Sequence, residues 1–312
     1  MSFSADVKKE LAEALPDKIC CRTAECYGLL EFGHAFRAGE ISLQTEQETI
    51  AELYTYLTTR ICQVPAPAAE TIRRRARLYV RSFPQAQDRE KILARFGHGT
   101  NEVSLRLNRA NLDCDGCVRA LLQGAFLACG AVTDPACDYH LEFSVPHYNL
   151  SRDLLSLLGE AGFPVKTVSR SGSYILYMKE SERIEDCLTY LGASRAALEM
   201  MNVKMVKSIR NETNRRFNCE NANIDKTVAA AGVQTEALER ICRSGGLSLL
   251  PEELRPLARL RLDNPDMSLR ELGEALDPPL TRSGVNHRMQ KILAFAAGLP
   301  EADPSKKSHT SV

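Results

Sequence analysis

Apolar residues recur at helical spacing in the segment from Ser268 to Phe295, near the end of the chain. At its start, Ser268 is followed three residues later by Glu271, which is typical of a capping box at a helix N-terminus. The leucines that follow fall on one helical stripe: Leu269, Leu272 and Leu276. The prolines in Asp277-Pro278-Pro279 then end this helix, because proline lacks a backbone N–H and restricts the residue before it. The pattern predicts a short helix followed by a tight turn.

A second helical run follows the turn and separates apolar from polar positions. At about 100° per residue its apolar face is formed by Val285, Met289, Ile292, Leu293 and Ala296. The positions that point away from this face, or lie on its flanks, are Ser283, Gly284, Asn286, His287, Arg288, Gln290 and Lys291. Two helices joined by a tight turn predict a helix-turn-helix, whose second helix can enter the major groove of DNA.

The polar side chains of this second helix are our candidates for DNA contact. Side chains with amide, hydroxyl or imidazole groups can bond to base edges, and these are Ser283, Asn286, His287 and Gln290. Phosphate contact is assigned to Arg282, Arg288 and Lys291, and Thr281 at the helix start completes the predicted set. Residues 251–300 carry seven basic and seven acidic side chains, but no acid follows the turn before Glu301. The alternative is an ordinary helical hairpin with a solvated polar face.

The first two thirds of the chain contain an internal repeat. The motif Cys21-x-x-Ala24-x-x-x-Gly28 recurs at an offset of 96 residues as Cys117-x-x-Ala120-x-x-x-Gly124. Each copy is followed by a strand-like segment, a helix-like segment, a β-rich pair of runs and a helix: 40–44, 48–62, 69–83 and 87–96, then 139–145, 150–161, 165–179 and 181–191. The sequence therefore predicts an α+β fold: two αββαββα units related by a pseudo-twofold axis, followed by an all-α helix-turn-helix domain.

The two central helices of this repeat are expected to pack closely, because small residues lie along them at Gly28, Gly124 and Ala128. The second of these segments, Leu122 to Gly130, resembles the nonapeptide helix of LAGLIDADG homing endonucleases at its first, third and last positions. Cys26 to His34 is a weaker first copy. In that family two such helices form the interface between the halves, so the resemblance implies the same arrangement here.

The same resemblance argues against nuclease activity. In the LAGLIDADG family an acidic residue at the eighth position of each copy binds the metal that cuts DNA. The eighth positions here are Gly33 and Cys129, neither of which offers a carboxylate oxygen to Mg²⁺. Glu31 stands at the sixth position of the first copy, and its counterpart is Leu127. We therefore assign no catalytic residue and expect no enzyme activity.

A run of arginines in the first half is a second candidate for contact with phosphate. Read as one strand, Ile72 to Arg81 places alternate side chains on one face: Arg73, Arg75, Arg77, Tyr79 and Arg81. LAGLIDADG proteins grip DNA with a concave sheet, so this face is a candidate surface for the DNA backbone. The equal alternative is a solvated sheet face paired with acids. The corresponding region of the second half offers only Lys166, Arg170 and Lys179.

Two pairs of cysteines, Cys20-Cys21 and Cys114-x-x-Cys117, precede the central helices and can in principle meet as four thiolates. An adjacent pair is a poor chelator, and Cys21 and Cys117 are equivalent small positions of the repeat. We therefore expect buried thiols, with no metal and no cofactor. The odd count of 11 cysteines is typical of reduced thiols in a cytoplasm and not of a disulfide framework.

Between the two predicted domains the chain becomes polar and basic. Residues 202–222 read as a linker, whose part before Phe217 has a net charge of about +4, and Arg210, Arg215 and Arg216 are candidates for contact with the DNA backbone. A helix capped by Asn223 or Asp225 then begins the second domain. The predicted domains are thus 1–201, with halves of about 1–110 and 111–201, and 223–300, followed by a disordered tail at 301–312.

Composition narrows the functional classes. The formal net charge is zero, so any contact with DNA must come from local patches and not from a general polyanion-binding field. No apolar run approaches the ~20 residues of a membrane span, and the N-terminus begins as an amphipathic helix. We expect a cytoplasmic, nucleoid-associated bacterial protein without a membrane partner.

The whole chain resembles the WhiA family. The resemblance runs from SFSADVKKEL and CCRTAE through GAFLACGAVTDP and RNETNRRFNCENANIDKTV to TRSGVNHRMQKI. It implies a role in cell division and chromosome segregation, with action in some lineages as a transcription factor at division and sporulation promoters. Double-stranded DNA in promoters is the expected partner, and the LAGLIDADG-like domain is a candidate surface for a protein. The alternatives are an interaction scaffold, a nonspecific nucleoid protein or, less favoured, an active endonuclease.

Overall fold

The computed structural model describes residues 2–73, 77–102 and 104–299 of the 312-residue chain. The chain divides into two compact units, Met1–Ser208 and Ile209–Val312. Two of the sequence predictions fall outside the described residues, namely the role of Arg75 and the tail at 301–312. The domain limits set from the sequence, at 201 and 223, stay a prediction.

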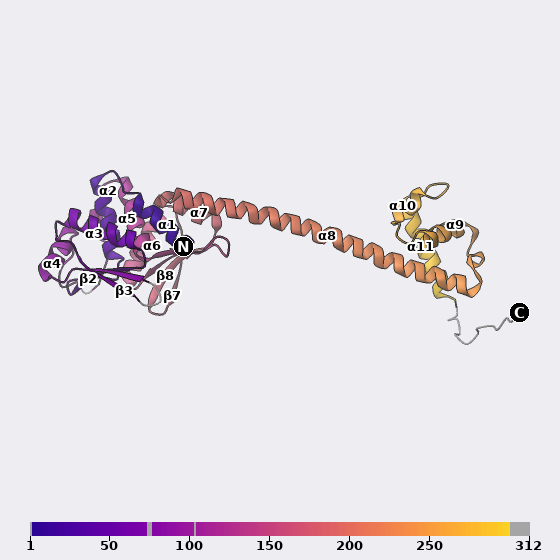
Figure 1. Cartoon of the computed structure of the whole chain (residues 1–312), viewed down its shortest axis with the longest axis horizontal. Helices are drawn as coiled ribbons and strands as arrows, with labels where there is room; N and C mark the ends of the chain where they lie inside the picture. Colours follow the sequence, from indigo (N-terminus) through magenta and orange to yellow (C-terminus); the bar gives the residue numbers. More distant parts are fainter. Residues whose placement is uncertain (1, 74–76, 103, 300–312) are drawn as a thin grey trace. The chain divides into compact units, whose positions relative to one another are not determined.

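After α1 (Phe3–Glu13), the first unit repeats one order of elements (Figure 1). The first copy is α2 (Ile19–Glu31), β1 (Ala35–Arg37), β2 (Glu40–Thr45), α3 (Glu48–Cys62), β3 (Ala68–Arg73), β4 (Arg77–Ser82) and α4 (Ala86–Arg95). After η1 (Arg109–Asn111), the second copy is α5 (Asp115–Cys129), β5 (Gly130–Val132), β6 (Leu141–Val145), α6 (Tyr148–Glu160), β7 (Lys166–Arg170), β8 (Ser173–Met178) and α7 (Ser181–Leu191). Both copies read αββαββα, which confirms the repeat.

Each copy forms its own four-stranded antiparallel sheet. The strand orders are equivalent, β1-β2-β4-β3 in the first copy and β5-β6-β8-β7 in the second. Side chains alternate across a strand, and in β6 the buried members are Leu141, Phe143 and Val145. One face of the sheet therefore belongs to the core, as is usual for antiparallel sheets with one face in water.

The arginine-rich run from Ile72 to Arg81 was wrongly interpreted as one strand. Its described residues belong to two antiparallel strands, β3 and β4, in which Arg73 lies opposite Arg77. Tyr79 is 7% exposed, and its hydroxyl donates to Glu48 Oε2 at 3.2 Å. Tyr79 therefore packs against α3. The face of β4 that carries Arg77 and Tyr79 is thus only partly open to solvent. The interpretation failed because period-2 alternation looks the same in one strand and in a hairpin without a Gly or Pro turn signal.

The central helices α2 and α5 touch through their glycines. A Cβ at Gly28 would collide with the backbone oxygen of Leu121, and a Cβ at Gly124 with that of Glu25. Glycine removes this collision and lets the two backbones come together. The predicted close packing at Gly28 and Gly124 is thus confirmed. The core of the unit surrounds this contact, with fully buried residues such as Tyr27, Leu121 and Phe126.

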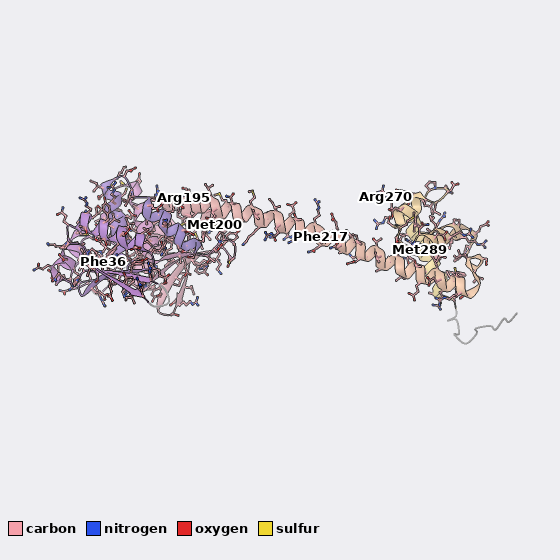
Figure 2. All side chains as sticks on the ribbon, viewed as in Figure 1. Phe36, Arg195, Met200, Phe217, Arg270 and Met289 are labelled. Carbon is pink, nitrogen blue, oxygen red and sulfur yellow. The ribbon has the colours of Figure 1, made fainter. Side chains whose placement is uncertain are left out.

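The polar segment expected as a linker lies within a helix. The helix α8 runs from Ser194 to Gly245 without interruption, so no helix start occurs at Asn223 or Asp225. Its first turns pack on the first unit through Ala196, Ala197 and Met200, but every residue from 208 to 230 is exposed. Phe217, for example, is 61% exposed (Figure 2). The helix was missed because a solvated helix carries no amphipathic period.

The second unit packs short helices on the end of α8. They are η2 (Leu247–Leu249), η3 (Glu252–Leu254), α9 (Arg255–Asp263), α10 (Leu269–Glu274) and α11 (Arg282–Ala297). Their core includes Leu238, Leu257 and Leu272. Met289 of α11 belongs to the same core (Figure 2). The capping box is confirmed, because Ser268 Oγ accepts from the N–H of Glu271 at 3.3 Å while Glu271 Oε2 accepts from the N–H of Ser268 at 2.7 Å.

Candidate nucleic-acid interface

The helix α11 is held in place by its apolar face and by its N-terminal cap. Val285, Met289, Ile292 and Ala296 are buried as the sequence predicts, whereas Leu293 is half-buried. Thr281 is the N-cap, and its Oγ1 accepts from the N–H of Gly284 at 3.2 Å. Thr281 thus starts the helix, which is a structural reason for its presence beside its predicted role in DNA binding.

The turn before α11 is closed by a glycine of the preceding helix. The N–H of Leu280 donates to the backbone oxygen of Gly273 at 2.9 Å. A Cβ at Gly273 would collide with the backbone oxygen of Leu280, so α10 and the turn can meet only at a residue without a side chain. This contact sets the start of α11 relative to α10 and completes the helix-turn-helix.

The predicted base-reading side chains share one exposed face of α11. They are Ser283, Asn286, His287 and Gln290, and each of them is exposed. Arg282, in the first turn, is exposed as well. Hydroxyl, amide, imidazole and guanidinium groups can all bond to groups in the major groove, so this face has the chemistry that DNA recognition needs.

Two predicted phosphate contacts, Arg288 and Lys291, are turned toward η3. Arg288 is half-buried and donates to the backbone oxygen of Glu253 at 3.3 Å. Lys291 Nζ lies 3.5 Å from Glu253 Oε1 in an exposed ion pair. Exposed pairs of this kind stabilise by about 0–1 kcal/mol and exchange readily, so Lys291 can turn to a phosphate at little cost. Arg288 also contributes to the packing of the domain.

A groove of about 550 Å³ adjoins the start of α11 and brings together basic residues that sequence reasoning missed. Its rim includes Lys226 of α8 and Arg270 of α10 beside Arg282. Arg270 pairs with Glu274 at 2.9 Å, and this pair is exposed. Lys226 and Arg270 are far from Arg282 in sequence, and only the packing of α8 against the helix-turn-helix places the three on one groove.

The basic stretch around residue 210 is partly neutralised by its own surroundings. Lys204 lies 3.3 Å from Glu182 and 3.5 Å from Glu185, and Lys207 donates to the backbone oxygen of Pro135 at 2.7 Å. The candidate residues that follow are exposed: Arg210, Arg215 and Arg216. Arg216 pairs with Glu220 at 3.6 Å along the helix.

The arginines of the first sheet lie at the paired ends of β3 and β4. Arg73 and Arg77 are exposed and directly opposite each other, whereas Arg81 is half-buried. In the second sheet Lys166 and Arg170 are exposed on β7. Both sheets thus present basic side chains, but without a continuous basic face among the described residues.

Where a LAGLIDADG nuclease binds its metal through a carboxylate, this chain has a thiol and a nearby ammonium group. Cys129 ends α5, and burial raises the pKa of its thiol to about 12. The Lys8 ammonium donates to the backbone oxygen of Leu127 at 3.1 Å, in a hollow whose described lining has Glu46 as its sole carboxylate. Burial lowers the pKa of Lys8, while its charge interactions with Cys129 and Glu46 act in the opposite direction. The other oxygen-bearing side chains of this lining are hydroxyls and amides, and the Lys8 ammonium repels a divalent cation.

Glu31, at the sixth position of the first nonapeptide, is no substitute ligand. Its side chain has no exposed surface, and burial raises the pKa of its carboxyl group well above the ordinary range. His98 Nε2 lies 3.9 Å from Glu31 Oε1. The His98 ring is also held by Tyr27 and Glu102, each at 2.8 Å. A neutral acid inside such a network belongs to the core.

The two cysteine pairs, which we expected to be buried thiols without a metal, meet. Cys21 and Cys117 are buried in the first turns of α2 and α5, which confirms their equivalence. Cys20 and Cys114 join them, and the four sulfur atoms form one group. Hydrogen bonds with the neighbouring thiols lower the pKa of Cys114 to about 7, whereas burial raises the pKa of Cys21 to about 12.

Both units of the chain match known protein families. Residues 118–210 match the model of the WhiA LAGLIDADG-like domain, and residues 213–296 match that of the WhiA C-terminal HTH domain. The chain is 38% identical over 307 residues to the "Probable cell division protein WhiA" of Syntrophomonas wolfei, covering 94% of this chain and 96% of the relative. It is 36% identical over 305 residues to the protein of the same name from Carboxydothermus hydrogenoformans, covering 95% and 97%.

The fold also matches a solved structure. The full-length DUF199/WhiA of Thermatoga maritima superposes with a TM-score of 0.58 at 20% identity, covering 97% of this chain and all of that one. A degenerate two-repeat LAGLIDADG-like domain followed by a helix-turn-helix domain therefore defines the class of this protein. At the level of the family, the chain belongs to WhiA. In the part of the chain that the structure describes, no helix is long and apolar enough to cross a membrane.

Proposed function

We propose that this protein is a sequence-specific DNA-binding regulator of bacterial cell division and chromosome segregation, and that α11 is its recognition helix. The single observation that carries the proposal is the exposed face of α11, where Ser283, Asn286, His287 and Gln290 stand together over a buried apolar face. Such side chains can contact base edges while the basic rim of Lys226, Arg270 and Arg282 contacts phosphates.

The role in cell division rests on the family. The curated relatives are named probable cell division proteins, and this chain matches them over 94% or more of its length in the two alignments given above. Promoters are the proposed targets, which makes transcription the proposed route to control of division. The protein acts in the cytoplasm, on the nucleoid, and Arg210, Arg215, Arg216, Arg73 and Arg77 are secondary contacts with the DNA backbone.

We further propose that the LAGLIDADG-like domain has no nuclease activity. What supports this is the chemistry at the two eighth positions, where Gly33 and Cys129 stand, together with the Lys8 ammonium, which interacts with Cys129. An ammonium group and a thiol whose pKa is raised to about 12 favour neither Mg²⁺ nor hydrolysis. The domain instead serves as a scaffold, with a surface available to a protein partner.

The test is selection of genomic fragments by the full-length protein with Mg²⁺ present, at about 150 mM salt, where nonspecific attraction to phosphate is weak. We expect a recurring sequence motif in the bound fragments and intact fragment ends. Fragments without a motif would favour a nonspecific nucleoid protein, cut ends would favour an endonuclease, and no bound DNA would favour an interaction scaffold.

The recognition helix is tested by Asn286→Ala on the selected motif. Loss of a base contact should weaken the free energy of DNA binding by about 1–3 kcal/mol and relax the sequence preference at one position of the motif. Glu239→Ala, an exposed change on α8 of the same unit, is the matched control and should alter neither quantity. Unchanged affinity and unchanged preference for Asn286→Ala would remove α11 from base reading. Binding is measured by fluorescence anisotropy on the motif and on each single-base variant of it.

A further inference from the structure

Four cysteine sulfur atoms gather where α2 and α5 begin. Cys20 and Cys21 lie in the first turn of α2, Cys114 is the N-cap of α5, and Cys117 lies in the first turn of α5. Each Sγ atom lies within 4.8 Å of the other three. Within the described residues, this is the sole group of three or more His, Cys, Asp and Glu side chains close enough to share a metal ion.

The spacing of these sulfur atoms matches one tetrahedral ion. Cys114 Sγ lies 3.6 Å from Cys20 Sγ, 3.6 Å from Cys21 Sγ and 3.5 Å from Cys117 Sγ. Cys21 Sγ and Cys117 Sγ are 4.0 Å apart. Four thiolates held about 2.3 Å from a zinc ion lie about 3.8 Å from one another in a regular tetrahedron. Four of the six sulfur–sulfur distances are therefore within a few tenths of an ångström of this value, and the other two are at most 4.8 Å. A disulfide, in contrast, needs sulfur atoms at about 2.05 Å.

We infer that Cys20, Cys21, Cys114 and Cys117 bind one zinc ion that joins the two halves of the LAGLIDADG-like domain. All four positions of a tetrahedral ion are then filled by protein, which is the pattern of a structural and not of a catalytic zinc site. Four sulfur ligands select a soft or borderline ion such as zinc over Mg²⁺ or Ca²⁺. This site is separate from the hollow at Cys129, which lies at the opposite end of α5.

Helix dipoles favour ionised thiols at the cluster, against the burial of Cys21 and Cys117, which raises the pKa of both thiols. The N-termini of α2 and α5 both point at the cluster, and the partial positive charge of a helix N-terminus stabilises a thiolate. A zinc ion with four thiolates carries a net charge of −2. Lys18 and Arg119 line the same hollow as Cys21, together with the acidic Asp17, so the positive charges of the lining exceed its negative charge by one and offset part of this charge.

Space at the cluster is kept by a glycine. A Cβ at Gly116 would lie 3.1 Å from Cys21 Sγ and 3.8 Å from Cys114 Sγ, so a side chain there would press on the ligands. Cys20 and Cys114 are half-buried, and an ion can reach the cluster from their side. The adjacent Cys20-Cys21 pair is a poor chelator by itself, but both of its sulfur atoms lie 3.6 Å from Cys114 because α5 brings the other pair to them.

The experiment is metal analysis of the full-length protein purified from zinc-containing medium, followed by Co²⁺ titration of the chelator-stripped protein. We expect about one zinc per chain and, with Co²⁺, the d–d and thiolate charge-transfer bands of a tetrahedral four-sulfur site. Cys114→Ser and Cys20→Ser should each weaken Co²⁺ binding by more than about 10-fold and change the bands. Cys137→Ser, an exposed cysteine outside the cluster, is the matched control and should leave both unchanged.

Several outcomes would overturn the inference. They are a zinc content no higher than that of Cys114→Ser, the absence of tetrahedral Co²⁺ bands, iron in place of zinc, or loss of the free thiols to disulfides. Far-UV circular dichroism separates lost binding from lost fold, and the half-buried Cys20 gives a second variant if Cys114→Ser does not fold. Chelator should lower the Tm of the wild-type protein but not that of the folded cysteine variant.

Discussion

At the scale of single residues, Glu25 places an ionisable group inside the contact between α2 and α5. Its side chain has no exposed surface, and its Oε1 accepts from Gln123 Nε2 at 3.2 Å. Burial raises the pKa of this carboxyl group to about 8, while the charge of Arg22 acts in the opposite direction. The folded protein therefore holds this proton more tightly than the unfolded chain does.

This proton makes stability depend on pH. The pKa of Glu25 in the unfolded chain is 4.5. The contribution of the protonated carboxyl group to the free energy of unfolding is complete below this pH, falls as the pH rises toward 8, and is lost above that value. We expect Glu25→Gln to change the free energy of unfolding little near pH 5 and to raise it by up to about 4 kcal/mol near pH 9. Urea unfolding at both pH values measures this.

The exposed Glu199→Gln is the control for Glu25→Gln, and it should behave as the wild-type protein does at both pH values. An equal effect of Glu25→Gln at both pH values would mean that Glu25 stays ionised in the folded protein.

Arg282 is the residue at which the phosphate contact is best tested. It is exposed at the start of α11, whereas Arg288 also donates to the backbone of η3 and its loss would disturb the domain. Arg282→Ala should weaken binding to all DNA sequences alike and reduce the slope of log K against log salt by about one. Arg259→Ala, an exposed arginine of α9 outside the groove, should change neither. A salt slope unchanged by Arg282→Ala would place the DNA backbone elsewhere.

At the scale of elements, the packing of α2 on α5 depends on direct contact between the two helix backbones at their glycines. Gly124→Ala places a methyl group against the backbone oxygen of Glu25, which cannot give way without moving a helix. We expect a loss of about 1–3 kcal/mol in the free energy of unfolding, the usual cost of overpacking. Gly159→Ala is the matched control, since a Cβ at that helical position meets nothing within 4 Å. It should raise the free energy of unfolding by about 0.5–1 kcal/mol.

Chemical denaturation of the two glycine variants measures both effects. A Gly124→Ala protein as stable as Gly159→Ala would show that the two helices can move apart freely.

Elements with a clear period or cap were predictable from the sequence. The capping box at Ser268 and the buried stripe at Val285 and Met289 are local patterns, so physics at short range decides them. The glycine contact at Gly124 joins distant segments and was predictable because the internal repeat pairs the two helices. The hairpin of β3 and β4 and the helical state of residues 202–222 were not predictable in this way. In both segments, charged side chains hide the period that distinguishes one structure from another.

The candidate sites also differ in how far they could be predicted from the sequence. The polar face of α11 was found because one helix carries it. The groove beside Lys226 and Arg270, and the meeting of Cys20 with Cys114, depend on contacts between distant segments. The repeat made a meeting of the cysteines conceivable, but only the packing of the chain decides whether such contacts form.

At the scale of the whole molecule, α8 takes part in both units. Its residues from 208 to 230 are all exposed, whereas Ala197, Met200 and Ile241 are buried. A helix without tertiary packing is marginal in water, so this stretch should open far more often than its ends. We expect amide hydrogen exchange at 209–222 to be at least about 100-fold faster than at 238–241 in the full-length protein. Equal protection of the two stretches would mean that another surface covers residues 209–222.

The glycine contact has a further consequence for the origin and assembly of the first unit. Gly28 meets Leu121 and Ala125, and Gly124 meets Glu25 and Leu29; each contact is the other shifted by the repeat offset. The surface is therefore isologous, like that of a twofold homodimer, although one chain provides both sides. A half-length ancestor would have paired with its own copy through this surface. The two halves, produced as separate polypeptides, should still recognise each other.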